Sequence, residues 1–262
     1  MYLYLSYNSC KEGFNNSNDD LLLDESNFGI KLNNDIYDNF YTFLYDEIND
    51  DDETRKVIAN TLIKYSSTIQ NHLLDASSKC GHLSELLTNS FDVKCIDKSD
   101  KMNVVHKNKY PHHHLITGNI KDSSVILPNT FTHVCIGELE IYDHKDVDFI
   151  FMNVDDWLIH NGHMFILVFK NMKLAKQYYD ENKLLMNGNF IYSSNLTQTS
   201  NTHYKLNEHI NSRYKQERTN IIDKYFHSND HLVYKAETNG FHYSGKESIN
   251  DKLDLLIFKK VH

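Results

Sequence analysis

The feature that most constrains this chain is a regular alternation of short apolar runs with segments of helical spacing. The apolar runs lie at 72–74, 93–96, 114–117, 131–136 and 164–169. They recur roughly every 20 to 35 residues, and helical patterns separate them. Parallel strands need such crossover connections, so the pattern predicts an α/β fold with a mostly parallel sheet and helices on both faces.

The segments outside this alternation predict additions at both ends. A stripe formed by Tyr37, Phe40, Tyr41, Leu44, Tyr45 and Ile48 predicts a helix, and a second helix is expected at 57–65. Residues 1–66 are therefore predicted to be a loosely packed lead-in, up to residue 33, and a helical cap. Residues 67–262 are predicted to form one globular unit.

Further elements are expected within that unit. Helices are predicted to open at 83–87 and 102–105 and to span 147–159, with a turn at Asn161-Gly162. One or two exposed strands are expected within 190–210. A helix at 232–239 and strands at 241–243 and 253–258 are expected to complete the sheet.

Charge and composition exclude several classes of protein. The net charge of −9 argues against a bulk nucleic-acid-binding protein. No apolar run approaches the roughly 18–20 residues of a membrane span, so no membrane partner is expected. The four cysteines form no CxxC pair, which is typical of reduced thiols in the cytoplasm.

Polar residues follow three of the predicted strands, where parallel α/β sheets bind ligands. Asp75 ends the first strand and precedes a turn at Gly81, Asp97 ends the second, and Gly118-Asn119 follows the third. A carboxylate after the second strand can accept both hydroxyls of a ribose, and an amide after the third can bond an adenine amine. The pattern therefore predicts an adenosine site.

At these positions the chain resembles class I S-adenosylmethionine-dependent methyltransferases, over roughly residues 37–260. Residues 73–81, LLDASSKCG, resemble the motif V-L-D-x-G-x-G-x-G, and 95–99 with Met102 resemble G-x-D-x-S-x-x-M. The other matching segments are Gly118-Asn119-Ile120, Phe131-Thr132-His133-Val134, Trp157-Leu158 with Asn161-Gly162, and Gly240-Phe241. Copies of this form resemble those of protists or of large DNA viruses.

The resemblance implies a Rossmann-like methyltransferase fold, with S-adenosylmethionine as cofactor and an unidentified acceptor that is a small molecule, a protein or an RNA. Glu138 and Glu140, after the fourth strand, become candidates for the catalytic base. The segment at 40–46 resembles one that caps the cofactor. The implied cofactor-binding residues are Asp75, Ala76, Ser77, Gly81, Asp97, Lys98, Met102, Asn119, Ile120 and Gly137.

The chain departs from the family pattern where Ser77 and Lys79 replace the first two glycines of the loop. A side chain where glycine adopts a positive φ costs roughly 1–3 kcal/mol. This leaves an alternative open, in which a catalytically inactive relative acts as a binding or regulatory module. A nicotinamide oxidoreductase is a second alternative, but it needs G-x-G-x-x-G after the first strand, which 77–83 do not supply.

Other conspicuous residues are interpreted as structural. His112-His113-His114 precede a strand, and neighbouring side chains of a strand alternate in direction, so no metal site is predicted. Tyr41 and Tyr45 lie on an apolar stripe and are expected in the core. Cys80, Cys95 and Cys135 are expected to be ordinary buried thiols.

Overall fold

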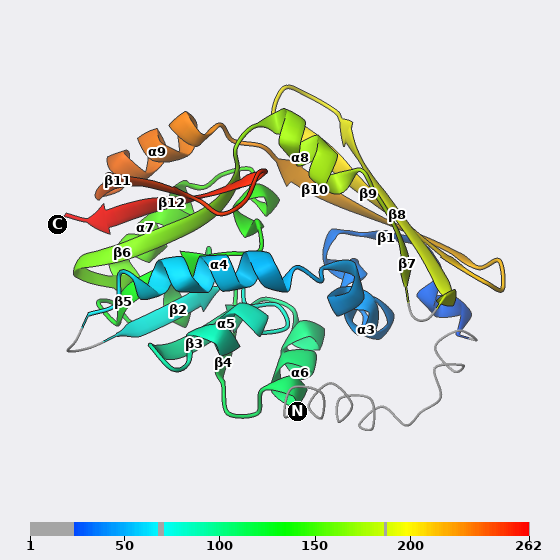
Figure 1. Cartoon of the computed structure of the whole chain (residues 1–262), viewed down its shortest axis with the longest axis horizontal. Helices are drawn as coiled ribbons and strands as arrows, with labels where there is room; N and C mark the ends of the chain where they lie inside the picture. The colour runs from blue at the N-terminus through cyan, green and yellow to red at the C-terminus, as the bar shows by residue number, and fades with distance from the viewer. Residues whose placement is uncertain (1–23, 68–70, 186–187, 262) are drawn as a thin grey trace.

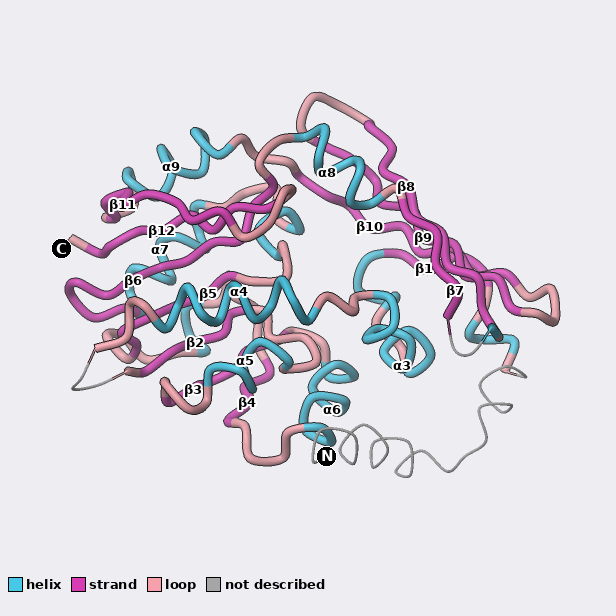
Figure 2. Tube along the Cα trace, in the orientation of Figure 1, coloured by secondary structure: helices cyan, strands magenta, loops and turns pink. Residues whose placement is uncertain are grey.

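A computed structural model describes residues 24–67, 71–185 and 188–261, which are organised around two sheets (Figures 1 and 2). The larger sheet has seven strands. Their order is β11 (Phe241–Ser248), β12 (Leu253–Lys260), β6 (Leu158–Phe169), β5 (Phe131–Ile136), β2 (His72–Ala76), β3 (Asp92–Asp97) and β4 (His114–Thr117).

The seven-stranded sheet is the predicted α/β core. Strands β2 to β6 pair in parallel, and β12 and β11 extend the sheet in antiparallel pairing. Helix α4 packs against α5, and α7 packs against both β6 and α9. The helices are α4 (Asp52–Ile63), α5 (His82–Leu87), α6 (Asp100–Lys109), α7 (Asp148–Trp157) and α9 (Asn229–Thr238). The architecture is an open, mostly parallel α/β sheet, as the alternation of strands and helices predicts.

The cap helix forms where the apolar stripe predicts it. Helix α3 (Asn39–Ile48) begins after Asp38, whose carboxylate accepts a hydrogen bond from the backbone N–H of Tyr41. Its apolar face is buried, including Tyr41 and Tyr45, as expected. Helix α4 begins five residues earlier than predicted, because Asp51 caps it in the same way.

The expected turn at Asn161-Gly162 is wrong. Strand β6 runs through both residues, and its pairing with β5 shifts register near there. Asn161 has a φ of 63°, which lets the strand bend without ending. The turn signal therefore marks an irregularity inside one long strand.

Strands are present within 190–210 as predicted, but they belong to a second, five-stranded sheet and alternate residues of them are buried. Helix α8 (Met172–Tyr179), which the sequence did not indicate, leads into it. Alternate side chains of its strand at 190–198 are buried, which is the pattern of a sheet packed on one face. The order is β1 (Gly29–Leu32), β10 (Glu217–Tyr225), β9 (His203–Ser212), β8 (Phe190–Gln198) and β7 (Glu181–Leu185).

Part of the predicted lead-in belongs to this second sheet. Residues 29–32, expected to be loosely packed, form β1 and pair in parallel with β10. Arg218 of β10 is fully buried and donates to Asp38 at 2.7 Å, so the start of the cap is fixed to the second sheet. Residues 1–23 of the lead-in lie outside the described part of the chain.

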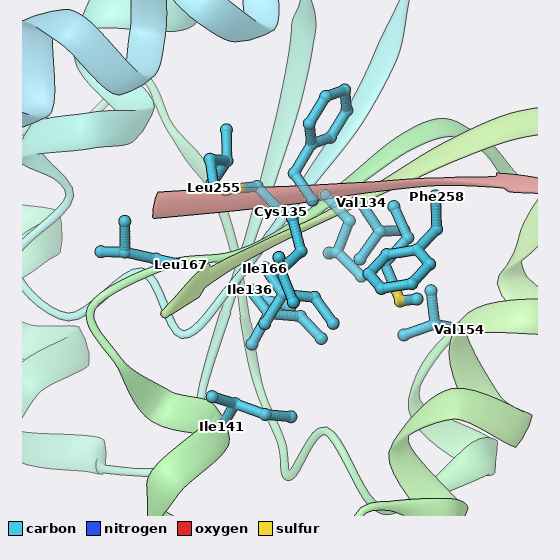
Figure 3. Packing of buried hydrophobic residues seen from close by; sticks show 14 of the residues in the cluster. Val134, Cys135, Ile136, Ile141, Val154, Ile166, Leu167, Leu255 and Phe258 are labelled. Carbon is cyan, nitrogen blue, oxygen red and sulfur yellow. The ribbon is translucent and has the colours of Figure 1, made fainter. Parts of the chain in front are cut away.

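Two apolar clusters hold these layers together. The larger cluster joins the central sheet to its helices, and Figure 3 shows Val134, Ile136, Ile166 and Phe258 packed within it. The smaller cluster joins α3 to β8 and β9 and also contains Cys80 and Met102. The cap, the second sheet and the loop after β2 therefore share one core. Within the described residues, no helix is long and apolar enough to cross a membrane.

We expect Gly81→Ala to destabilise the fold by about 2–4 kcal/mol, measured by chemical denaturation. Gly81 has a φ of 82°, and a Cβ there would lie 2.4 Å from Nε2 of the buried His106. Gly29→Ala is the matched control, because Gly29 has a φ of 89° but a Cβ there would meet no described heavy atom within 4 Å beyond its chain neighbours. Equal losses for the two variants would show that only backbone strain matters.

Candidate functional site

Two carboxylates stand at the ends of neighbouring strands. Asp75 lies in β2 and Asp97 ends β3, and the register places Asp75 opposite Cys95. Asp97 follows Cys95 by two positions, so both carboxylates project from the same face of the sheet. Both are buried, at 1% and 4% exposure. Two buried acids therefore lie on one face of the sheet, at the carboxyl ends of adjacent strands.

A small cavity lies at this edge and includes most of the predicted cofactor-binding residues. Its volume is about 10 Å³, enough for roughly one water molecule. A pocket for a cofactor-sized ligand measures some 300 Å³ or more. The site is therefore closed by its own side chains. The lining residues are Ala76, Ser77, Ile96, Asp97, Lys98, Gly118, Asn119, Ile120 and Glu140.

Lys79 is one side chain that closes the site. It is 5% exposed, and its Nζ lies 2.8 Å from Oε2 of Glu140 and 3.8 Å from Oδ2 of Asp97. The Nζ also stands 5.3 Å from the centre of the Tyr37 ring. Burial would lower the pKa of Lys79, but the charge of Glu140 raises it well above its usual value. A lysine ammonium therefore occupies the space beside the loop.

The loop after β2 has positive φ angles at two residues that carry side chains. Ser77 has a φ of 120° and Lys79 a φ of 46°, both in the region that disfavours side chains. Local bonds hold this strained backbone: Ser77 Oγ donates to the Gly137 carbonyl, and the Lys79 N–H donates to Asp97 Oδ2. The two residues thus adopt a conformation that favours glycine, at the positions where the resembling motif has glycine.

Glu140 balances the buried lysine and sits in a cluster of cations. Its carboxylate lies 3.7 Å from Nζ of Lys98 and 3.3 Å from Nε2 of His144. Burial raises the pKa of Glu140, but Lys79 and a hydrogen bond from His144 outweigh burial and hold that pKa well below its usual range. Glu140 is therefore a weak proton acceptor.

The remaining predicted residues lie around the cavity without lining it. Gly81 begins α5, the Gly137 carbonyl accepts from Ser77, and Met102 is buried in the smaller apolar cluster. Glu138, the other candidate base, lies 3.5 Å from Nε of Arg55. Asn119, by contrast, does line the cavity; it is exposed and accepts a hydrogen bond from the backbone of Lys121, as a turn residue does.

Asp75 carries an acceptor that the described residues leave unused. Its Oδ2 accepts from Ser84 Oγ at 2.5 Å, while Oδ1 is buried and has no hydrogen-bond partner in the described part of the chain. Burial raises the pKa of Asp75 to about 7, although the hydrogen bond from Ser84 lowers it. Such an oxygen suits an ammonium or hydroxyl donor.

Comparisons with solved structures identify the fold. The chain superposes on an S-adenosylmethionine-dependent methyltransferase from Clostridium acetobutylicum with a TM-score of 0.67 and 14% identity, covering 85% of this chain and 98% of that one. It also matches CalS10, an amino pentose methyltransferase from Micromonospora echinaspora, with a TM-score of 0.68, 12% identity, and 84% and 96% coverage. The sugar N-methyltransferase KedS8 from Streptoalloteichus matches with a TM-score of 0.67 and 13% identity, covering 85% of this chain and 93% of that one.

These matches show that the chain has the fold of class I S-adenosylmethionine-dependent methyltransferases, as its sequence motifs indicated. No family model and no curated protein matches the sequence. At identities of 12–14%, the comparisons establish the fold and leave the chemistry to the residues of the site.

The residues at this edge have the polar groups that the cofactor requires, but the cavity between them is too small to hold it. Asp97 and Ile120 line the cavity, and the buried Oδ1 of Asp75 accepts no hydrogen bond from the described residues. However, both oxygens of Asp97 accept backbone N–H groups, from Lys79 and Ser99, and the Lys79 ammonium lies against Asp97 and Glu140, which both line the cavity. A cavity of about 10 Å³ does not hold a molecule of the size of S-adenosylmethionine.

Sequence reasoning identified the loop substitutions but missed their partner. Lys79 and Glu140 are 61 positions apart, and the ion pair between them depends on how β2 and β5 pair. The one available signal was a new cation in the loop, which needs a nearby anion if it is buried.

We expect the stability of the protein to fall as pH rises through the range in which Asp75 titrates. The native pKa, about 7, lies above the unfolded value near 3.8, so the native state holds the extra proton between them. Asp75→Asn removes this slope. Between about pH 5 and about pH 8, its stability should improve relative to the wild type by about 2 kcal/mol in urea denaturation. A parallel pH dependence in both proteins would contradict the assignment.

Proposed function

We propose that this chain is an S-adenosylmethionine-dependent methyltransferase whose cofactor site is held closed by its own Lys79–Glu140 ion pair. One observation carries the proposal. Asp75 and Asp97 lie on one face at the ends of adjacent strands, and a loop with the path of a glycine-rich turn runs beside them. This fold places the cofactor at that edge.

The cofactor, when bound, supplies an activated methyl group on a sulfonium. In the proposed site Asp97 accepts the ribose hydroxyls, Asn119 and Ile120 border the adenine, and Asp75 accepts from the amino group. The remaining residues proposed to line or shape the cofactor site are Ala76, Ser77, Gly81, Lys98, Met102 and Gly137. Most of the rate enhancement would come from positioning, as is general for such transfers.

Lys79 sets the affinity of this site. Separating a buried ion pair costs about 3–5 kcal/mol, which corresponds to a loss of roughly 10²–10⁴-fold in affinity. Once Lys79 leaves Glu140, its ammonium can pair with the cofactor carboxylate. We therefore propose that the wild-type chain binds the cofactor weakly.

The acceptor is proposed to be a small molecule with an amine or hydroxyl group. Support comes from the structural neighbours, two of which act on sugars, and from matches that cover 84% and 85% of this chain. Glu140 already pairs with Lys79, so Glu138 is the better candidate for taking the acceptor's proton. The cytoplasm remains the proposed location.

A second candidate function rests on the same ion pair. If Lys79 never leaves Glu140, the chain is a methyltransferase fold without a cofactor, which serves as a binding or regulatory module. The buried position of Lys79 and the cavity of about 10 Å³ favour this candidate. Cofactor affinity separates the two functions.

We expect the double variant Lys79→Gly/Glu140→Gln to bind S-adenosylhomocysteine or S-adenosylmethionine at least 100-fold more tightly than the wild type in calorimetry. It removes both members of the ion pair, so neither Lys79 nor Glu140 is left buried without the other, and it places glycine at a position with positive φ. Asp97→Asn in the same background is the control and should abolish the gain.

Each outcome decides between the proposals. Micromolar binding by the wild type would support the methyltransferase and contradict the closure by Lys79. Absence of binding by both proteins would contradict the cofactor proposal and support the non-catalytic candidate. Methyl transfer from labelled cofactor to amino sugars, tested with the double variant, then examines the acceptor.

A further inference from the structure

Three histidines and a glutamate meet on the side of α5 that faces the turn before β4. Glu85 lies on α5, His106 on α6, and His112 and His113 on the turn between α6 and β4. Nε2 of His112 lies 3.0 Å from Oε2 of Glu85, and Nε2 of His113 lies 2.9 Å from the same oxygen. This cluster takes no part in the proposed methyl transfer.

The structure corrects the expectation that these histidines diverge. His112 and His113 precede β4 in a turn, so the alternation of strand side chains does not apply to them. Only His114 begins the strand. Their acidic partner Glu85 is 27 positions away from His112, which is why sequence spacing did not reveal it.

We propose that Glu85, His112 and His113 bind a divalent zinc-class metal ion. Imidazole nitrogens and one carboxylate are ligands that zinc accepts, and three protein ligands leave a position for water. Neighbouring ligand atoms of a tetrahedral zinc site lie about 3.3 Å apart. The two contacts to Glu85 are slightly shorter, and the three ligand atoms lie within 4.8 Å of one another. His112 is mostly exposed, so it can complete the geometry.

The hydrogen bonds of the His106 and His113 rings independently favour a cation at this place. Nδ1 of His113 lies 2.8 Å from Nε2 of His106, whose Nδ1 lies 3.2 Å from the Lys79 carbonyl. Three contacts thus join Glu85, His113, His106 and this carbonyl, and both ends of the series are acceptors. Nδ1 of His106 also lies 3.4 Å from Ser78 Oγ, which can donate to it, but the Lys79 carbonyl then faces a nitrogen without a proton. Two neutral imidazoles carry only two protons for the three contacts.

A metal ion at Glu85 removes this deficit. If the ion binds Nε2 of His113, the proton moves to Nδ1 and is donated to His106, which then donates to the Lys79 carbonyl. Every contact is satisfied with neutral rings. A bond from a ligand's second nitrogen to an acceptor is the usual way in which proteins orient metal-binding histidines.

The neighbouring group of Cys95, His106 and His113 is a poorer site. The contact between the two rings, at 2.8 Å, already belongs to the series of hydrogen bonds that an ion at Glu85 would complete. Cys95 donates to Ser84, and burial raises the pKa of its thiol to about 12. The proposed ion therefore lies on the Glu85 side of His113.

The test is a calorimetric titration of the chelator-treated full chain with Zn²⁺ alone. We expect one tightly bound ion, with affinity at least tenfold weaker in Glu85→Gln and in His112→Ala. His112 is exposed, so His112→Ala should fold normally. His242→Ala removes an exposed histidine of β11 and is the matched control, expected to leave affinity unchanged.

Nitrogen NMR of the histidine rings gives a second readout. Zinc should move the proton of His113 from Nε2 to Nδ1 and raise the thermal midpoint by several degrees. Zinc binding that His112→Ala and Glu85→Gln leave unchanged would overturn the proposal. An absence of tight Zn²⁺ binding would also overturn the proposal. This outcome includes the case in which a doubly protonated histidine ring supplies the missing hydrogen bond at neutral pH. None of these outcomes depends on whether the chain binds S-adenosylmethionine.

Discussion

The buried ion pair between Lys79 and Glu140 is the interaction on which the character of this site depends. It joins the loop after β2 to the segment after β5, at the edge where the two buried aspartates meet. A buried charge is tolerated only with a partner, so the two side chains are interdependent. The carboxylate of Glu140 also lies close to Lys98 and His144, so the closed state depends on a network of contacts and not on one ion pair alone.

Much of the central sheet could be predicted because its information is local. The strands at 114–117 and 131–136 have the predicted bounds, since each is an apolar run between polar turns. Strand-end residues such as Asp75 and Asp97 could also be placed, because parallel strands bring their carboxyl ends to one edge. The positive φ of Ser77 and Lys79 agrees with the expectation drawn from the missing glycines.

The parts that were missed depend on distant partners. The second sheet was reduced to one or two exposed strands because its buried face appears only when α3 packs on it. The partner of Lys79 and the convergence of His112 and His113 on Glu85 likewise come from pairings 27 to 61 positions apart. Periodicity reports which side of an element is apolar, but it does not report which charged groups will meet.

The parallel pairing of β1 with β10 has a consequence for how the protein is made. Residues 29–32 bond to 218–221, and Asp38 receives the guanidinium of Arg218. On the ribosome, residues 29–32 must therefore wait for about 190 further residues before β10 can pair with them. A nascent chain arrested before β10 would have neither the strand that pairs with β1 nor the guanidinium that binds Asp38.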